Sequence, residues 1–198
     1  MAVHMTRELV RLESRRIITA AHDAAIIHAT KDISIRAGVV KDNSVCTTMD
    51  AYEKHFIGQL GQQAISQFTG APCDGKLYLY GDRGIDMIFA GQAVQIKTSK
   101  RSYQNHHAYL DSLDEFKADW LIECSLHTVA CVCVHGFISK YKFARVCFNG
   151  NLGYGKRKLV KESDLTDIDK FVAMLNSHGI DGEGLSLASA KANGDLFV

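Results

Sequence analysis

The chain has 198 residues, of which 46% are hydrophobic and 23% charged, and its formal net charge is +1. These values are typical of one globular domain with a single core, and they exclude a disordered, fibrous or two-domain chain. The longest apolar run, residues 128–134, is about strand length, whereas a membrane span needs roughly 18 apolar residues. We therefore expect a protein without a membrane segment.

The N-terminus and the cysteines predict the compartment. The first residues, MAVHMTREL, become charged at once and lack the apolar stretch of a secretory signal. The six cysteines contain no C-x-x-C pair, which is typical of reduced and mostly buried thiols. We therefore expect a cytoplasmic protein.

Helix-forming residues dominate the first part of the chain. Residues 6–30 contain no Gly or Pro and are rich in Leu, Ile, Ala, Arg and Glu, which predicts a long helix. In such a helix Arg7, Arg11 and Arg15 share one face, which either contacts phosphates or a partner subunit or is simply solvated.

A second helix is predicted from about residue 48 or 50. Its apolar stripe has helical spacing, and Gly70 and Pro72 follow it in the order that ends a helix. Gly58 and Gly61 lie on or beside the stripe, where each costs about 1 kcal/mol in helix propensity. Two glycines in one helix therefore indicate close packing against a sheet.

Strand patterns and a last helix make up the rest of the chain. The strands are expected over 76–80, 85–89, 92–97, 120–124, 127–134 and 137–146, the second and third forming a hairpin. A short helix is expected over 110–117, and a last helix capped by Ser163 carries the apolar residues Leu165, Ile168, Phe171, Val172 and Leu175.

This order of elements predicts an α/β (α+β) fold with a central mixed sheet flanked by helices. We expect three parts: an N-terminal helical segment over 1–45 that serves as an arm or in dimerisation, a core over 46–179, and a tail over 180–198.

The predicted hairpin gathers polar side chains. Strand alternation puts Gln95 and Lys97 on one face, and a two-residue turn at Ala90-Gly91 sets Asp86 across from Gln95. Burying a carboxylate, an amide oxygen and an ammonium without partners costs several kcal/mol, so a cleft with a bound ion is a natural setting. A purely structural ion pair between Lys97 and Asp86 is the alternative interpretation.

Asp86, eight intervening residues and then Gln95-Ile96-Lys97 form a pattern that resembles the PD-(D/E)XK nuclease superfamily. The segment GQLGQQAISQFTG (58–70) is similar to the first helix of that superfamily, and KTSKR and ADWLI are similar to the segments after its catalytic Lys. The resemblance spans about 50 to 146. It implies a restriction-endonuclease-like core, with a central mixed sheet, helices on both sides and the site at one edge.

The resemblance implies a site for Mg²⁺, for which Mn²⁺ substitutes. Asp86, Gln95 and the main-chain carbonyl of Ile96 are then the expected ligands, and the ion polarises the phosphate and lowers the pKa of a bound water. Lys97 is expected to position that water and to stabilise charge on the phosphate.

Three residues depart from the pattern. Ile85 replaces the Pro of the superfamily name, which is a frequent change there, and the other two affect the metal site. Gln95 replaces the usual Asp or Glu, as in some restriction endonucleases of the superfamily, and Gln62 stands where many relatives carry Glu. An amide oxygen ligates Mg²⁺ but contributes no charge. The expected substitute is Glu53, one or two turns earlier on the same helix, followed by Asp82 in the turn before the strand.

Charge is segregated late in the chain. Residues 140–161 contain seven Lys or Arg and no acid, and residues 162–198 contain seven acids and two bases. The basic run either faces a polyanion or is a solvated face. Given the resemblance, we expect contacts with the DNA backbone and an affinity for DNA that falls with salt concentration. The expected contact residues are Lys100, Arg101, Lys156, Arg157 and Lys158.

The expected function is that of a metal-dependent endonuclease, a homodimer that hydrolyses phosphodiester bonds of duplex DNA in the manner of a restriction enzyme. One alternative is a structure-specific nuclease of repair or of mobile elements, or a junction resolvase. The other is a catalytically decayed DNA-binding protein on the same fold, which Gln95 and Gln62 favour.

Three other patterns have simpler interpretations. His106-His107 is expected on a surface loop, because adjacent loop residues point apart. Cys131 and Cys133 are expected to be core side chains in a strand, because a zinc site needs two more ligands. Residues 150–156, GNLGYGK, lack the full phosphate-loop motif and predict a hairpin loop.

Overall fold

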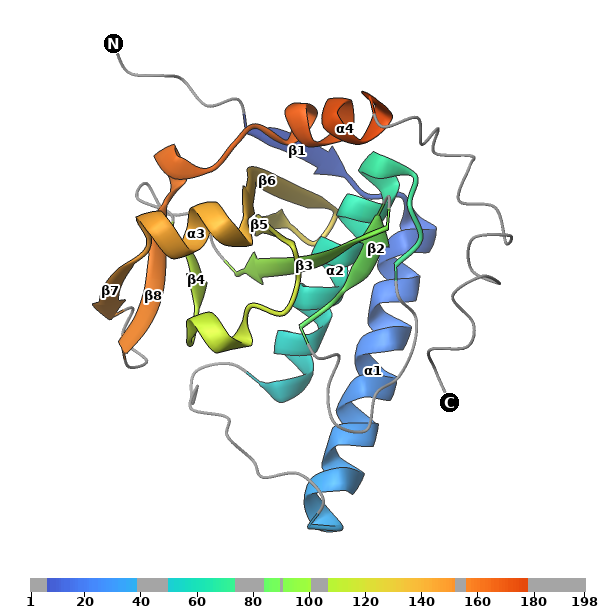
Figure 1. Ribbon diagram of the computed structural model, residues 1–198. Helices are drawn as coiled ribbons and strands as arrows, with labels where there is room; N and C mark the ends of the chain where they lie inside the picture. Colours follow the sequence, from blue (N-terminus) through green and yellow to red (C-terminus); the bar gives the residue numbers. More distant parts are fainter. Residues whose placement is uncertain are drawn as a thin grey trace.

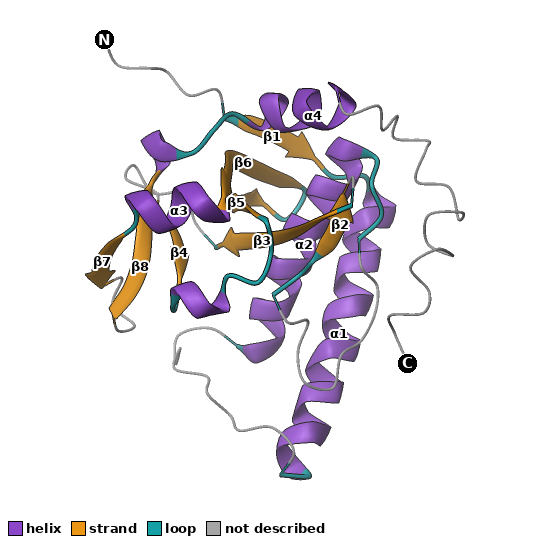
Figure 2. Ribbon diagram, in the orientation of Figure 1, coloured by secondary structure: helices purple, strands orange, loops and turns teal. Residues whose placement is uncertain are grey.

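The chain forms two sheets with helices around them (Figures 1 and 2). The computed structural model describes residues 7–38, 50–73, 84–89, 91–100, 107–151 and 156–177. The larger sheet is mixed and curled, and its strand order is β1 (Glu8–Arg11), β6 (Cys131–Ser139), β5 (Trp120–Thr128), β3 (Gln92–Ser99) and β2 (Met87–Phe89). This confirms the predicted class, a mixed sheet flanked by helices.

Two long helices lie side by side over one face of this sheet (Figure 1). They are α1 (Ser14–Arg36) and α2 (Ala51–Thr69). As predicted, α2 begins after Asp50, whose carboxylate accepts a hydrogen bond from the Tyr52 amide, and ends at Gly70 in the left-handed conformation (φ 74°). The core under α2 includes Leu60, Ala64, Ile65, Val94, Ile96 and Ile122.

The predicted hairpin is present and sets the register of the sheet edge. Strand β2 pairs antiparallel with β3, with Met87 opposite Val94 and Ile88 opposite Ala93. On its other side β3 runs parallel to β5, with Lys97 opposite Glu123. The strand expected over 76–80 lies outside the described residues.

One of the two helix glycines has the predicted packing role. A Cβ atom on Gly61 would overlap the Thr98 hydroxyl of β3, whereas Gly58 faces open space. The missing side chain of Gly61 therefore lets α2 approach β3 closely.

The other face of the sheet carries a smaller layer. The second sheet has the order β4 (His107–Leu110), β8 (Lys156–Lys161) and β7 (Phe148–Asn151), and it lies with η1 (Leu113–Glu115) and α3 (Lys140–Val146) around a second core. In that core the Phe116 and Phe143 rings meet edge to face, with centroids 5.5 Å apart. Helix α4 (Ile168–Ser177) follows η2 (Glu162–Asp164) and packs Phe171 on Phe137 of β6, in the core that α2 also covers.

The predicted helix over 6–30 is wrong at its start. Residues 8–11 form strand β1, which pairs antiparallel with β6, and the helix runs from Ser14 to Arg36. Val10 and Leu12 are buried, so strand pairing outweighs local helix propensity here. Consequently Arg7, Arg11 and Arg15 do not share a helix face. The described part of segment 1–45 belongs to the main sheet and to the layer over it.

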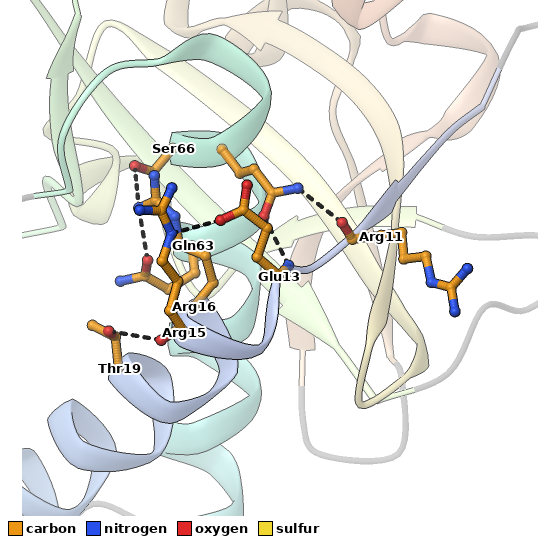
Figure 3. A network of polar contacts seen from close by, with 8 residues as sticks. Arg11, Glu13, Arg15, Arg16, Thr19, Gln63 and Ser66 are labelled. Carbon is orange, nitrogen blue, oxygen red and sulfur yellow. Dashed lines mark hydrogen bonds and ion pairs between the residues drawn. The ribbon is translucent and has the colours of Figure 1, made fainter.

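Polar side chains join the start of α1 to α2 (Figure 3). Arg16 donates from Nη1 to Oε1 of Gln63 (3.0 Å) and to Oγ of Ser66 (3.1 Å). The Thr19 hydroxyl donates to the Arg15 carbonyl at 3.0 Å, within α1. The buried Gln63 and Ser66 of α2 thus connect this helix to the start of α1.

The strand expected over 137–146 is also wrong beyond its third residue. Strand β6 ends at Ser139, whose hydroxyl accepts a hydrogen bond from the Lys142 amide (3.2 Å) and starts α3. The helix buries Phe143 in the second core, and this burial favours a helix in a segment whose sequence is also compatible with a strand.

Several other boundaries differ. The strand expected over 127–134 is wrong, because a turn over 129–130 interrupts it. Strand β5 continues past its predicted end to Thr128, and β6 begins at Cys131 and continues without a break to Ser139. The expected helix over 110–117 is the end of β4 followed by η1, and Ser163 lies in η2, before α4. None of the helices in the described part of the chain combines the length and apolar composition needed to cross a bilayer.

Candidate active site

The hairpin places Asp86 opposite Gln95, as its register predicts. Extending the β2–β3 pairs by one residue brings the two together, and the Asp86 amide donates to the Val94 carbonyl at 2.8 Å. The exposed fraction is 7% for Asp86 and 5% for Gln95. A carboxylate and a neutral amide are therefore buried side by side at the start of β2.

Two described donors hold the Asp86 carboxylate. Gln62 Nε2 donates to Oδ1 at 2.5 Å, and the main-chain amide of Ile96 donates to Oδ2 at 2.6 Å. A carboxylate has about four lone-pair sites, so such a group can accept hydrogen bonds and bind a cation at the same time.

Gln62 is the residue that the sequence prediction underestimated. It was identified as a departure from the superfamily pattern, yet it makes the direct contact with Asp86. The available signal was Gly61, because the neighbour of a close-approach glycine on a helix lies within reach of the sheet.

The structure does not bring Glu53 to this site. Glu53 lies nine residues before Gln62, which is about 13 Å along a helix axis. Its Oε1 pairs instead with Nζ of Lys100 at 2.5 Å. The second substitute, Asp82, lies outside the described residues.

Gln95 has an unsatisfied acceptor. Its side-chain Oε1 is buried, and no described residue donates a hydrogen bond to it. The amide lies close to Gly84: a Cβ on Gly84 would be 3.1 Å from Gln95 Nε2 and 3.3 Å from the carbonyl oxygen of Glu115. A buried acceptor without a donor costs about 1–3 kcal/mol, which a bound cation would recover.

Lys97 follows Gln95 on the same face of β3. It is half-buried and lies in register with Glu123, which is fully buried on β5. Among the described residues Lys97 forms no ion pair, and Asp86 is held by Gln62 and Ile96. The alternative of a structural Lys97–Asp86 ion pair is therefore not formed.

The oxygen atoms gathered here fit a hard divalent cation. The possible ligands are the Asp86 carboxylate, the Gln95 amide oxygen and the Ile96 carbonyl, and Mg²⁺ prefers such oxygens together with water. No group of three His, Cys, Asp or Glu side chains suited to a metal occurs in the described ranges. Burial raises the pKa of the nearby Cys73 thiol to about 11, so that thiol stays neutral. With one carboxylate among these possible ligands, binding is expected to be weak.

The residues expected to contact DNA fall into two groups. Lys100 and Arg157 are neutralised, the first by Glu53 and the second by Asp111, and the Arg157 guanidinium lies 5.1 Å from the Tyr109 ring centroid. Lys156 is exposed and Lys158 half-buried, and neither pairs with a described acid. Arg101 lies outside the described residues.

A second polar network crosses the sheet at β5 and β6. Ser125 Oγ lies 2.7 Å from His135 Nε2, and His135 Nδ1 lies 2.9 Å from Glu162 Oε1. Arg7 donates to both Glu162 oxygens, at 2.6 and 2.8 Å. Burial acts to raise the pKa of Glu162, but hydrogen bonds from Arg7 and His135 outweigh it and lower that pKa.

The order of Ser, His and Glu in this network matches that of a catalytic triad. However, Ser125 and His135 are fully buried in adjacent strands, so a substrate does not reach the hydroxyl. The network is structural and ties the residue before β1 to η2.

The simpler interpretations of other motifs hold in part. Cys131 and Cys133 are free thiols in β6. Cys133 is buried, which raises its pKa, whereas Cys131 is only partly buried and is not a core side chain. The ends of the 150–156 segment belong to the antiparallel pair β7 and β8, as a hairpin requires. The loop expected at His107 is wrong, because His107 begins strand β4 and pairs with Lys161. Its side chain and His106 lie outside the described residues.

Comparisons of the chain with family models, curated proteins and solved structures give no match. The interpretation of the site therefore rests on its own residues.

Proposed function

We propose that this chain is a metal-dependent nuclease that hydrolyses phosphodiester bonds of DNA, with Asp86, Gln95 and Lys97 as its centre. The observation that carries the proposal is the buried and unsatisfied Gln95 oxygen beside the Asp86 carboxylate. This pair has the composition of an incomplete cation site. The resemblance of the Asp86 to Lys97 pattern to PD-(D/E)XK nucleases supports the same function.

Each residue has a distinct role in the proposed reaction. Asp86, Gln95 and the Ile96 carbonyl hold Mg²⁺, which when bound polarises the phosphate and lowers the pKa of a water ligand. Gln62 and the Ile96 amide fix the direction of the Asp86 carboxylate. Lys97, which has no ion-pair partner among the described residues, donates to the phosphate and stabilises the charge that develops there.

The arrangement of elements supports a restriction-endonuclease-like core. The glycine-containing helix α2, the β2–β3 hairpin and the following strand β5 occur in the order that the resemblance implies, with helices on both sides of the sheet. The proposed substrate is duplex DNA, cut by a homodimer in the cytoplasm. A structure-specific nuclease is the closest alternative.

A decayed, DNA-binding form of the fold is the second candidate function. One observation favours it: among the described residues, Asp86 is the single carboxylate of the possible ligands, because Gln62 and Gln95 are neutral. The two candidates differ in whether the protein turns over DNA.

A cleavage assay separates them. Supercoiled plasmid is incubated with the protein in Mg²⁺, Mn²⁺ or EDTA, and Asp86→Ala is compared with Asp114→Ala, which removes an exposed carboxylate of η1. The proposal expects metal-dependent nicking that Asp86→Ala abolishes and Asp114→Ala preserves. DNA binding without cleavage in every metal would favour the decayed form.

A further inference from the structure

Helix α3 presents a basic and aromatic surface. It buries Phe143 in the second core and exposes Ala144 and four larger side chains. These four are together called the α3 surface: Lys140, Tyr141, Lys142 and Arg145. Tyr141 is 72% exposed, which is a large fraction for an aromatic side chain in a folded domain. Packing in the core does not require these four residues.

The positive charges of the α3 surface are not neutralised. Helix α3 contains no acidic residue, and none of its three cations forms an ion pair with a described residue. Lys100 and Arg157, by contrast, are each paired with a carboxylate. A polyanion therefore meets more available charge on α3 than on those two predicted contacts.

Aromatic rings accompany this charge. The Arg145 guanidinium lies 5.5 Å from the Tyr141 ring centroid. Beside the ring, a shallow depression is lined by Gln92, Asp119, Trp120, Ser139, Lys140 and Tyr141. Its one carboxylate, Asp119, accepts a hydrogen bond from the Ala93 amide at 2.9 Å. The depression thus combines a lysine with two flat side chains.

We propose that the α3 surface binds a single-stranded segment of DNA. Lys140, Lys142 and Arg145 contact the phosphates, and an unpaired base stacks on Tyr141 at the depression. Stacking on an exposed ring needs a free base face, which paired bases inside a duplex do not offer. A polyanion without bases, such as a sulfated polysaccharide, satisfies the lysines but leaves the ring unused.

This site narrows the proposed substrate from duplex DNA in general to duplex DNA that contains unpaired nucleotides, and it rests on the proposed function in taking DNA as the substrate. The structure links the two regions. Phe143 of α3 packs on Phe116, which directly follows Glu115, and both the Glu115 carbonyl and the Gln95 amide lie close to Gly84. The segment around η1 therefore connects α3 with the candidate centre.

The test measures binding in EDTA, so that cleavage does not interfere. Fluorescence anisotropy of a labelled oligo(dT) strand, and of a duplex of the same length, is recorded for the full chain over a series of salt concentrations. We expect Tyr141→Ala to weaken single-strand binding about tenfold and Tyr141→Phe to stay within about twofold. Replacing Lys140, Lys142 and Arg145 together with Ala lowers the single-strand salt slope by about 2.

Lys170→Ala, which removes an exposed lysine of α4, is the matched charge control and leaves both affinities unchanged. Equal single-strand affinity of Tyr141→Ala and the unsubstituted protein overturns the proposal. The proposal is also overturned if Tyr141→Ala weakens heparin binding as much as it weakens single-strand binding, because heparin has no bases. If the protein does not cleave DNA but its single-strand binding depends on Tyr141, the proposed nuclease function is contradicted and the α3 surface is supported. If the protein cleaves DNA but its single-strand binding does not depend on Tyr141, the nuclease function is supported and the α3 surface is contradicted.

Discussion

Gln62 and Asp86 form a buried hydrogen bond between α2 and the start of β2, with Nε2 of the amide 2.5 Å from Oδ1 of the carboxylate. The bond joins a helix to a strand 24 residues later in the chain. It leaves a neutral side chain where a second acid would complete a divalent-cation site.

Gln62→Glu is expected to make the stability of the protein depend on Mg²⁺. Two carboxylates in contact repel each other, which raises the pKa of one of them. We expect this repulsion to lower the free energy of unfolding by about 1–3 kcal/mol. Mg²⁺ binds the folded form and restores this loss. Thermal unfolding in EDTA and in Mg²⁺ measures both effects.

The control is Gln59→Glu, on the same helix and outside the Asp86 contact. It should show no response to Mg²⁺. If Gln62→Glu also ignores Mg²⁺, the site at Asp86 does not bind divalent cations.

Gln95→Glu is expected to lower the Mg²⁺ concentration needed for half-maximal cleavage. The change replaces an unsatisfied amide oxygen with a charged ligand, and hard cations bind more tightly as ligand charge increases. A titration of Mg²⁺ at fixed plasmid concentration gives the value. An unchanged or higher requirement, in a folded variant, would show that Gln95 does not contact the ion.

The sequence predicted the register of Asp86 and Gln95 better than it predicted the first elements of the chain. The register of Asp86 and Gln95 follows from a two-residue turn and strand alternation, which are local rules. By contrast, residues 8–11 join the sheet because β6, more than a hundred residues later, offers an unpaired edge. Local propensity contains no information about such a partner.

The contacts of the predicted polar residues illustrate the same limit. Glu53 is a reasonable ligand by helix and charge, but its partner is Lys100, which the curvature of the fold brings close. Likewise Arg157 belongs to a basic run in the sequence, whereas strand pairing sets it beside Tyr109 and Asp111. Neutralising partners across strands are visible only in three dimensions.

Lys97→Ala is expected to reduce cleavage by about a hundredfold or more while DNA binding in EDTA changes little. Removing one preorganised donor to a developing charge typically has this effect. Plasmid nicking and anisotropy, measured on the same preparation, separate turnover from binding. Lys117→Ala, which removes an exposed lysine before β5, is the control and should cleave normally. Wild-type cleavage by Lys97→Ala would remove Lys97 from the mechanism.

The proposed homodimer is expected to form through α1. The outward face of α1 exposes Ile18 (70%) and Ile33 (66%) at its two ends, with Ala25 and Ala29 between them. An antiparallel pairing of two copies about an axis near Ala25 brings each Ile18 to the other copy's Ile33. Ile18→Asp combined with Ile33→Asp should therefore give a monomer.

Sedimentation velocity at micromolar concentration measures this difference. Val129→Asp, at the exposed turn between β5 and β6, introduces the same charge elsewhere and should leave the dimer intact. A monomeric unsubstituted protein, with or without DNA, would contradict the proposed assembly.

Glu162 is expected to make the protein sensitive to acid. Its carboxylate is mostly buried, and the hydrogen bonds from Arg7 and His135 lower its pKa below the ordinary value of 4.5 despite the opposing effect of burial. A pKa that is lower in the folded state means that the unfolded state binds more protons. This stabilisation is therefore present above about pH 4.5 and is lost as pH falls through the folded pKa.

Glu162→Gln should cost about 2 kcal/mol of unfolding free energy at pH 7, the usual contribution of hydrogen bonds to a charged group. In urea unfolding from pH 7 to pH 3, the gap between the variant and the unsubstituted protein should narrow below pH 4.5, whereas Glu115→Gln, at an exposed position, should show no gap. A gap that stays constant across this range would mean that the Arg7–Glu162–His135 contacts do not depend on the charge of Glu162.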